Sequence, residues 1–409
     1  MEGYHDPREH QDPQLREQNL LASLQEVVDY ARRQCSHYSQ TLVAVESGSL
    51  TSRAALSELP LLRKSDLIQL QQAHPPLGGV AAMTACVDRL FLSPGPIAEP
   101  ERCEPDWWRM GRAFRAAGFT PGMRVQNCLS YHLSPGGFIL DSGARACGCS
   151  VIPAGPGQTE QQLAVNAHLK PEGYCGTPSF LAILLDKAEA MGQRLSFDVA
   201  LVTGEALPAS LRARFEAAGI QVRQAYATAD VGLIAYESQP DTGLIVDEDL
   251  LLEVVRPGTG TPVPEGEVGE VVVTSFNPDY PLIRFATGDL SSVLTAPSPC
   301  GRTNLRIRGW QGRADQSTKV KGLFVHPGQL EQLCNRIDGL SRVRAVVRQL
   351  AGQDSLELLC EPEAMPTASA GEVEAQARAL LRLGVAARWV EPGALPRDGV
   401  VIEDTRPVP

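Results

Sequence analysis

Between residues 123 and 208, short apolar runs alternate with glycine-bearing loops and helix-like segments. Residues 123–130 and 149–154 have the composition of strands, and a loop of small and polar residues follows each. Ser179 has the type and position of an N-cap for the next helix. Such alternation predicts an α/β fold with a mostly parallel sheet. Ligands of these sheets bind at the carboxyl ends of the strands, where the loops fall.

Other parts of the chain show different periodicities. Residues 15–35 carry leucine and valine at helical spacing, and residues 106–118 indicate a helix closed by a glycine. Residues 245–275 are typical of antiparallel strands, and their glycine turn precedes no helix, which excludes a dinucleotide fingerprint. Beyond residue 322, alternating helical and strand-like segments predict a compact α+β region.

Composition restricts the class of partner and the compartment. The 409 residues carry a formal net charge of −11, which argues against nucleic acid and anionic membranes because both attract basic surfaces. No apolar run approaches the ~18 residues that a membrane span requires. The first residues are polar and lack a signal-peptide core, and ten cysteines are scattered without a C-x-x-C pair. We therefore predict a cytoplasmic protein with reduced thiols.

Two polar residues stand out between residues 280 and 322. A strand-like run ends at Gly288 and Asp289, and a second run leads into a basic turn that holds Arg313. A carboxylate such as Asp289 can accept two hydrogen bonds from a vicinal diol, and Arg313 can donate to a phosphate or to the same sugar. The alternative is a β-hairpin followed by an exposed basic turn.

The sequences PLIRFATGDL and GRADQSTKVKGLFVHPGQLE in this stretch resemble the hinge region of adenylate-forming enzymes, and more narrowly the phenylacetate–CoA ligase branch. The resemblance implies a large N-terminal AMP-binding body, residues 1–311, with several subdomains, mostly parallel sheets and a small β-region. Residues 312–409 would form a small α+β C-terminal lid. Asp289 and Arg313 would hold the ribose, and Asp315 would be the hinge.

The sequence QAYATADVG is similar to the family pattern Tyr-Gly-x-Thr/Ser-Glu, whose tyrosine stacks on adenine and whose carboxylate holds Mg²⁺. Tyr226 matches the tyrosine, and Ala227 lies beside it in the same site. Thr228 would supply the hydroxyl for the α-phosphate, because Ala229 occupies its usual place. Asp230 is a shorter carboxylate at the metal position and is still a hard oxygen ligand. The alternative for Asp230 is a helix-capping residue at the end of a strand.

Two further loops complete the site by the same resemblance. One wall of the adenine pocket would be formed by Gly204, Glu205 and Ala206. The acyl pocket would be lined by Tyr131, His132, Gly136, Gly137 and Phe138. The alternatives are a structural hydrogen bond for the histidine and helix-entry turns for the glycines.

The chain departs from the family where phosphates are held. The family loop is rich in Ser, Thr and Gly and ends in lysine, whereas here Ser93 and Gly95 are the residues that fit, between prolines that lack an N–H. The family lid ends in Gly-Lys, but no lysine follows Lys321, and Arg397 is the nearby cation with a different shape and reach. The segment around Lys64 resembles an N-terminal Pro-x-x-x-Lys-x-Asp-Leu pattern, for which we expect a scaffold role.

These matches predict an acyl- or aryl-CoA ligase that uses ATP, Mg²⁺ and coenzyme A. Lys319 matches another lid lysine, and Gly322 matches the glycine beside the pantetheine arm. The predicted catalytic residues are Asp230, Thr228, Lys319 and Arg397. The expected partners are a small carboxylic acid and the thiol of CoA or of a carrier protein, and the resemblance also suggests a homodimer. Two alternatives stay open: transfer to a carrier protein or an amine, and a non-catalytic nucleotide-binding relative.

Overall fold

The computed structural model describes residues 4–311, 313–314, 318–321, 323–325, 327–350, 353–363, 366, 368–396 and 400–406. The chain divides into two compact units. The first holds Met1–Thr287 and Ser291–Trp310, and the second holds Gly288–Leu290 and Gln311–Val408. Within the described ranges, we find no helix that is both long enough and apolar enough to cross a membrane.

The largest sheet of the first unit follows the order β14–β15–β10–β9–β8–β7–β6–β4–β5. Strands β4 to β8 pair in parallel, whereas β8 to β10 and the strands beyond them pair antiparallel. The parallel strands are β4 (Arg124–Asn127), β5 (Ser150–Pro153), β6 (Gly173–Gly176), β7 (Val199–Val202) and β8 (Gln221–Thr228). The antiparallel strands are β9 (Gly232–Tyr236), β10 (Leu244–Val246), β14 (Val293–Leu294) and β15 (Arg306–Ile307). This arrangement confirms the predicted α/β class.

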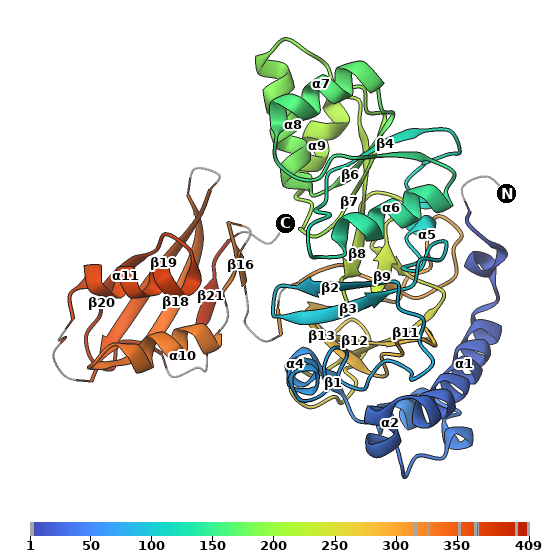
Figure 1. Ribbon diagram of the computed structural model, residues 1–409, viewed down its shortest axis with the longest axis horizontal. Helices are drawn as coiled ribbons and strands as arrows, with labels where there is room; N and C mark the ends of the chain where they lie inside the picture. Colours follow the sequence, from blue (N-terminus) through green and yellow to red (C-terminus); the bar gives the residue numbers. More distant parts are fainter. Residues whose placement is uncertain are drawn as a thin grey trace. The chain divides into compact units, whose positions relative to one another are not determined.

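One helix directly precedes the parallel strands in the chain, and four more alternate with them (Figure 1). They are α5 (Gly111–Ala116), α6 (Gly136–Ala146), α7 (Thr159–Leu169), α8 (Pro178–Ala190) and α9 (Ala209–Ala217). Figure 1 shows α7, α8 and α9 grouped together beside β6 and β7. The sequence VALV of β7 is buried at every position, as expected for a strand covered on both faces.

Two predictions of helix ends were wrong for local reasons. The helix expected over residues 106–118 is reduced to Gly111–Ala116, because Asp106 and Arg109 have positive φ angles of 55° and 63°. The Asp106 carboxylate instead accepts a hydrogen bond of 3.0 Å from the Gly111 N–H. The cap of α8 is Thr177 and not Ser179: the Thr177 hydroxyl accepts from the Phe180 N–H at 3.2 Å.

A second sheet of the first unit has the order β1–β13–β12–β11, and β2 and β3 form a separate hairpin. These strands are β1 (Leu62–Arg63), β2 (Arg89–Ser93), β3 (Ile97–Glu101), β11 (Leu250–Val255), β12 (Gly269–Ser275) and β13 (Phe285–Ser291). The N-terminal helical elements are η1 (Pro7–His10), α1 (Pro13–Gln34), α2 (Ser36–Thr41), η2 (Ser47–Ser49), α3 (Arg53–Ser57) and α4 (Lys64–Ala73). The amphipathic helix predicted over residues 15–35 is α1, whose leucines and valines enter the core of this unit.

The second unit is an α+β structure with its own hydrophobic core. Its main sheet has the order β20–β19–β18–β21. The strands are β16 (Thr318–Val320), β17 (Leu323–Val325), β18 (Leu340–Leu350), β19 (Gln353–Pro362), β20 (Ala386–Trp389) and β21 (Ile402–Asp404). The helices are α10 (Pro327–Arg336) and α11 (Ala370–Leu381), and α11 begins with a capping box between Ser369 and Glu372.

Candidate active site

The end of β8 and the turn that follows it carry three predicted site residues. The Tyr226 hydroxyl donates to Thr287 Oγ1 at 3.2 Å, which fixes the ring at the end of β8. The Thr228 hydroxyl oxygen accepts from the Val231 N–H at 3.2 Å and so closes the turn. Asp230 is followed by strand β9 rather than by a helix, so the helix-capping alternative for this residue is wrong.

The Asp230 carboxylate is buried and paired with a lysine. Its side chain is 1% exposed, and Lys64 Nζ lies 2.8 Å from Oδ2 in an ion pair. The other carboxylate oxygen, Oδ1, has no hydrogen-bond partner among the described residues. Hard divalent cations take carboxylate oxygens as ligands, and a buried oxygen without a partner is available to such a cation. The donor set at Asp230 therefore fits the Mg²⁺ that the resemblance implies.

The β2–β3 hairpin holds the degenerate phosphate loop. Ser93 pairs with Ile97, and the Ser93 hydroxyl donates to Glu99 Oε2 at 2.9 Å. Glu99 is 2% exposed, and burial together with the nearby Asp230 charge raises its pKa to about 8. The loop residues between the strands include two prolines without N–H groups, so Gly95 and the Ser93 hydroxyl are what the loop offers to a phosphate.

The ends of β7 and β8 lie next to each other because the two strands are parallel neighbours. The Thr203 hydroxyl donates to the Ala225 carbonyl at 2.8 Å and joins the two strand ends. Beyond Thr203, Gly204 and Ala206 continue the chain, and Glu205 accepts a hydrogen bond of 3.4 Å from the Ser179 N–H. The predicted adenine wall and the segment with Tyr226 thus follow the carboxyl ends of adjacent strands, as the sheet rule requires.

The predicted acyl-pocket residues gather between β4 and α6. Asn127 Nδ2 donates to the Tyr131 hydroxyl and to the Gly137 carbonyl, both at 2.8 Å. The rings of Tyr131 and Phe138 lie edge to face with centroids 5.2 Å apart. A side chain at Gly137 would meet the Tyr131 ring at 2.8 Å, so this glycine is needed for the packing. His132 is exposed.

A cation that sequence reasoning did not select also faces this aromatic pair. The Arg89 guanidinium lies 4.8 Å from the centroid of the Phe138 ring and pairs with Glu101 at 2.8 Å. Cation–π geometry of this kind orients both side chains. Arg89 was missed because nothing in the local sequence of β2 shows which ring it will cover.

The second unit contains the predicted ribose residues. Arg313 Nη1 donates to Asp289 Oδ1 at 2.9 Å, and both side chains are largely buried. Lys319 lies on β16 and is half-buried, and its carbonyl accepts from Arg406 at 2.9 Å. Asp315, Gly322 and Arg397 lie outside the described residues, so their predicted roles stay predictions.

Two residues of the first unit belong to the site although the prediction gave them no role in it. Lys64 was expected to be scaffold, but it begins α4 and forms the ion pair with Asp230. Glu99 was not singled out. Its signal in the sequence is the alternation of Ile97 and Glu99, which puts an acid on the buried side of β3.

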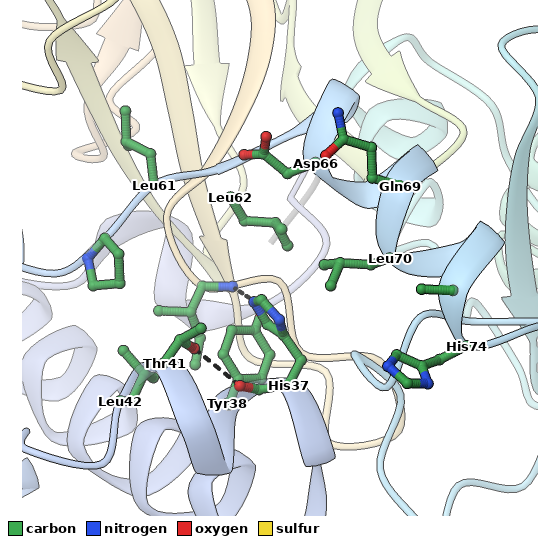
Figure 2. Close-up of a pocket in the computed structure, with 13 residues that line it drawn as sticks. His37, Tyr38, Thr41, Leu42, Leu61, Leu62, Asp66, Gln69, Leu70 and His74 are labelled. Atoms are coloured by element: carbon green, nitrogen blue, oxygen red, sulfur yellow. Dashed lines mark hydrogen bonds between the residues drawn. The ribbon is translucent and has the colours of Figure 1, made fainter.

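A separate groove of about 400 Å³ lies among α2, β1 and α4, away from these residues (Figure 2). The Tyr38 hydroxyl in its wall donates to the Pro281 carbonyl at 3.0 Å and accepts from the Ile283 N–H at 3.1 Å. The Asp66 carboxylate accepts from the Arg63 N–H at 3.0 Å. Because these polar groups serve the backbone, we assign no chemistry to the groove.

Known proteins resemble the chain over most of its length. Residues 109–277 match the family model described as AMP-binding enzyme. Phenylacetate-coenzyme A ligase of Aromatoleum evansii is 30% identical over 331 residues, or 76% of this chain and 74% of that protein. Phenylacetate-coenzyme A ligase of Thermus thermophilus is 29% identical over 357 residues, or 83% and 79% of the two chains.

A solved structure shares the fold. The crystal structure of 2-hydroxyisobutyryl-CoA ligase in complex with 2-HIB-AMP and CoA has a TM-score of 0.83 to this chain at 22% identity. The match covers 99% of this chain and 93% of that one. The family model and these relatives together show an adenylate-forming enzyme. Within that class, the chain belongs to the phenylacetate–coenzyme A ligase family.

Proposed function

We propose that the chain activates a carboxylic acid with ATP and transfers the acyl group to the thiol of coenzyme A. In the first step, a carboxylate oxygen attacks the α-phosphorus and the bond to the β-phosphate oxygen breaks, which gives an acyl-adenylate and pyrophosphate. In the second step, the thiol sulfur attacks the acyl carbon, AMP leaves with the electron pair of the C–O bond, and the thiol proton passes to solvent. The observation that supports the proposal most is the buried Asp230 carboxylate after β8, which pairs with Lys64 and whose Oδ1 has no hydrogen-bond partner among the described residues.

The residues of the first unit would bind and orient the substrates. Tyr226, Ala227 and the segment Gly204, Glu205 and Ala206 would enclose adenine, and Thr228 would contact the α-phosphate. Asp230 would hold Mg²⁺, which when bound supplies positive charge against the phosphate oxygens. Ser93 and Gly95 would touch the outer phosphates. The acid, with an aryl or a small aliphatic group, would lie against the paired rings of Tyr131 and Phe138.

The second unit would contribute the remaining groups. Asp289 and Arg313 would hold the ribose hydroxyls, with the arginine orienting the carboxylate. Lys319 and Arg397 would supply positive charge to the adenylate, Asp315 would be the hinge, and Gly322 would pass the pantetheine arm. A cytoplasmic location and a homodimer belong to the same proposal.

The assay is pyrophosphate release from ATP and Mg²⁺ with a panel of aryl and aliphatic acids, followed by mass spectrometry of acyl-CoA after coenzyme A is added. We expect acid-dependent release and a matching thioester for at least one acid. Arg397→Ala should lower adenylation, and Arg397→Lys should retain part of it. A thioester on a carrier protein, or an amide, in place of acyl-CoA would assign the chain to the transfer variant.

A second candidate is a non-catalytic nucleotide-binding relative. It is favoured by the buried Glu99 on β3, next to the phosphate loop, and by the absence of any lysine after Lys321. Binding of ATP or AMP without pyrophosphate release from any acid would establish this candidate and exclude the ligase.

A further inference from the structure

The turn that carries Asp230 is held by the short segment that precedes helix α5. The Trp108 carbonyl accepts a hydrogen bond of 3.0 Å from the Leu233 N–H. Arg109 Nη2 donates to the Val231 carbonyl at 2.8 Å and to the Leu233 carbonyl at 3.1 Å. One guanidinium group therefore binds the main chain on both sides of the residue that begins β9, directly after Asp230.

The residue that follows Asp230 is fixed on both sides of its own backbone. The Val231 N–H donates to the Thr228 hydroxyl at 3.2 Å, and the Val231 carbonyl accepts from Arg109. The Val231 side chain is buried in the core of the first unit. Because these contacts leave the turn little freedom, they determine where the Asp230 carboxylate can reach.

Arg109 is itself anchored by a fully buried acid. Arg109 Nε donates to Asp247 Oδ2 at 2.6 Å, and Arg112 Nε donates to Asp247 Oδ1 at 3.1 Å. Asp247 has 0% exposure, and its N–H donates to the Ile234 carbonyl of β9 at 2.9 Å. A guanidinium presents its donors in a rigid plane. The arginine therefore links the buried acid after β10 to the turn before β9 at a fixed separation.

The backbone at Arg109 is strained. Its φ angle is 63°, a conformation that costs a residue other than glycine roughly 1–2 kcal/mol. Such strain persists only where the surrounding contacts determine it, and it is frequent at functional sites. Here the strained residue is the one that binds the turn with Asp230, which gives the strain a role beyond ending the helix.

We infer that Arg109 is a positioning residue of the ATP site, which holds the turn so that Asp230 presents its carboxylate to the divalent cation. The inference rests on the proposed function, because that function places Mg²⁺ at Asp230. Arg109 acts through the backbone of Val231 and Leu233 and not by touching substrate. Replacing a residue that orients a metal ligand typically lowers metal affinity or activity by about 10–100-fold.

The test compares the dissociation constants of ATP with and without Mg²⁺, measured by isothermal titration calorimetry on the full chain. Wild type is expected to bind ATP more tightly with Mg²⁺. Arg109→Lys keeps a positive charge beside Asp247 but cannot span the acid and both carbonyls. ATP with Mg²⁺ should bind about tenfold more weakly to this variant. ATP without Mg²⁺ should bind within about twofold of wild type.

Arg212→Lys is the matched control, because Arg212 serves the other end of the same strand. Arg212 Nη2 donates to both carboxylate oxygens of Glu237, which follows β9, at 2.7 and 2.9 Å. Arg212 Nη1 donates to the Val222 carbonyl at 3.1 Å. Both arginines thus bind a buried acid and the main chain, so both variants should lose stability in urea. Only Arg109→Lys should weaken the binding of ATP with Mg²⁺.

Hydrogen–deuterium exchange of the peptide that spans residues 228–234 reports the turn directly. The Val231 and Leu233 amides should exchange slowly in wild type, faster in Arg109→Lys and at the wild-type rate in Arg212→Lys. If Arg109→Lys does not fold, which circular dichroism would show, Arg109→Gln replaces it. That variant leaves the acid paired with Arg112 and removes both carbonyl contacts.

Four results would each overturn the inference. They are rapid exchange of the turn amides in wild type, unchanged exchange in the Arg109 variants, an equal loss of ATP affinity with Mg²⁺ in Arg212→Lys, and no effect of Mg²⁺ on ATP binding by wild type.

Pyrophosphate release, measured in parallel, separates this inference from the proposed function. Weaker binding of ATP with Mg²⁺ in Arg109→Lys, without pyrophosphate release by wild type from any acid, would leave the positioning role standing and reject the ligase. Acid-dependent release by wild type, with Arg109→Lys binding ATP and Mg²⁺ as wild type does, would do the reverse.

Discussion

Two buried acids of the first unit have opposite surroundings. Glu253 on β11 receives two hydrogen bonds of 3.0 Å from Arg284, which is itself almost fully buried. Arg284 uses its remaining donors on the carbonyls of Ser57, Leu59 and Gly260. Asp230 pairs with the Lys64 ammonium through Oδ2, and its Oδ1 has no hydrogen-bond partner within the described part of the chain.

The difference in surroundings distinguishes a structural acid, Glu253, from a candidate site acid, Asp230. A buried charge that is fully paired and hydrogen-bonded has no capacity left for a ligand, and breaking it costs stability. A buried acid with an oxygen that lacks a hydrogen bond lowers the stability of the fold. Such an acid is expected at a binding site, where a ligand supplies the missing contact. We therefore expect changes at Glu253 and Arg284 to act on folding and changes near Asp230 to act on binding and catalysis.

The largest effect is expected from Arg284→Met. It leaves Glu253 buried without its counter-charge, which typically costs about 3–5 kcal/mol in the free energy of unfolding. Urea denaturation followed by circular dichroism measures it. Arg33→Met is the control, because Arg33 is 61% exposed in its pair with Asp29 and such pairs contribute at most about 1 kcal/mol. Equal losses of unfolding free energy in the two variants would contradict the expected difference between the buried Arg284–Glu253 pair and the exposed Arg33–Asp29 pair.

Gly232→Ala should destabilise the protein by about 2 kcal/mol, because the added methyl group would overpack the core at the turn that carries Asp230. Gly232 has φ 79°, and a Cβ atom would lie 2.8 Å from Trp108 Cβ and from its carbonyl oxygen. Gly258→Ala is the matched control, with φ 81° and nothing within 4 Å, so it reports the backbone strain alone, about 1 kcal/mol. Urea denaturation compares the two. If both glycines cost the same, the packing against Trp108 is not what holds the turn.

Tyr226→Ala should weaken AMP binding by roughly tenfold, because stacking of a base on an aromatic ring contributes about 1–3 kcal/mol. Tyr226→Phe retains the ring and loses the hydrogen bond to Thr287, so it should bind AMP almost as well as wild type. Isothermal titration calorimetry measures both. A loss that is as large in the Phe variant as in the Ala variant would assign the effect to the hydroxyl.

Cys300 provides a smaller test of how donors stabilise a partly buried anion. Burial raises the pKa of the Cys300 thiol. Hydrogen bonds from Ser238, Ser298 and Arg302 lower this pKa by a larger amount, so the net result is a pKa of about 7. Because the thiolate is the reactive form, alkylation of Cys300 should rise with pH around a midpoint near 7. Ser238→Ala removes one donor and should move the midpoint upward. Peptide mapping after iodoacetamide measures it, with Cys128 as the control.

For that control, burial raises the pKa of Cys128 to about 12, so its thiol should stay unmodified across the same pH range. Equal reactivity of Cys128 and Cys300 at pH 7 would contradict the assigned role of the hydroxyl donors.

The sequence was most informative where the relevant contacts are local. The pattern around Tyr226 and Asp230 lies within one strand and one turn, so its residue types alone indicated the chemistry. The placement of Gly204 beside it follows from the parallel order of β7 and β8, which the strand–loop–helix alternation predicted in outline. Fold class and family were predicted correctly for this reason.

Contacts between residues far apart in the chain could not be predicted from the sequence. Nothing near Lys64 indicates that helix α4 will bring its ammonium to Asp230, because that contact depends on how β3, α4 and the second sheet pack. The helix expected over residues 106–118 is shorter because Asp106 and Arg109 have positive φ angles, which their residue types do not predict. The Ser179 cap was wrong because Thr177 stands two residues earlier and precedes a proline at the first helical residue.

The most direct test of the account is a paired measurement on Asp230→Asn: acid-dependent pyrophosphate release and the free energy of unfolding, each compared with wild type. We predict that release falls by about 100-fold or more, as for other electrostatic groups aimed at a transition state. Stability should change by less than about 1 kcal/mol, because Lys64, with a side chain 32% exposed, can turn to water. A variant that loses about 3 kcal/mol or more of stability but keeps its pyrophosphate release would show that Asp230 is scaffold, and would contradict the account.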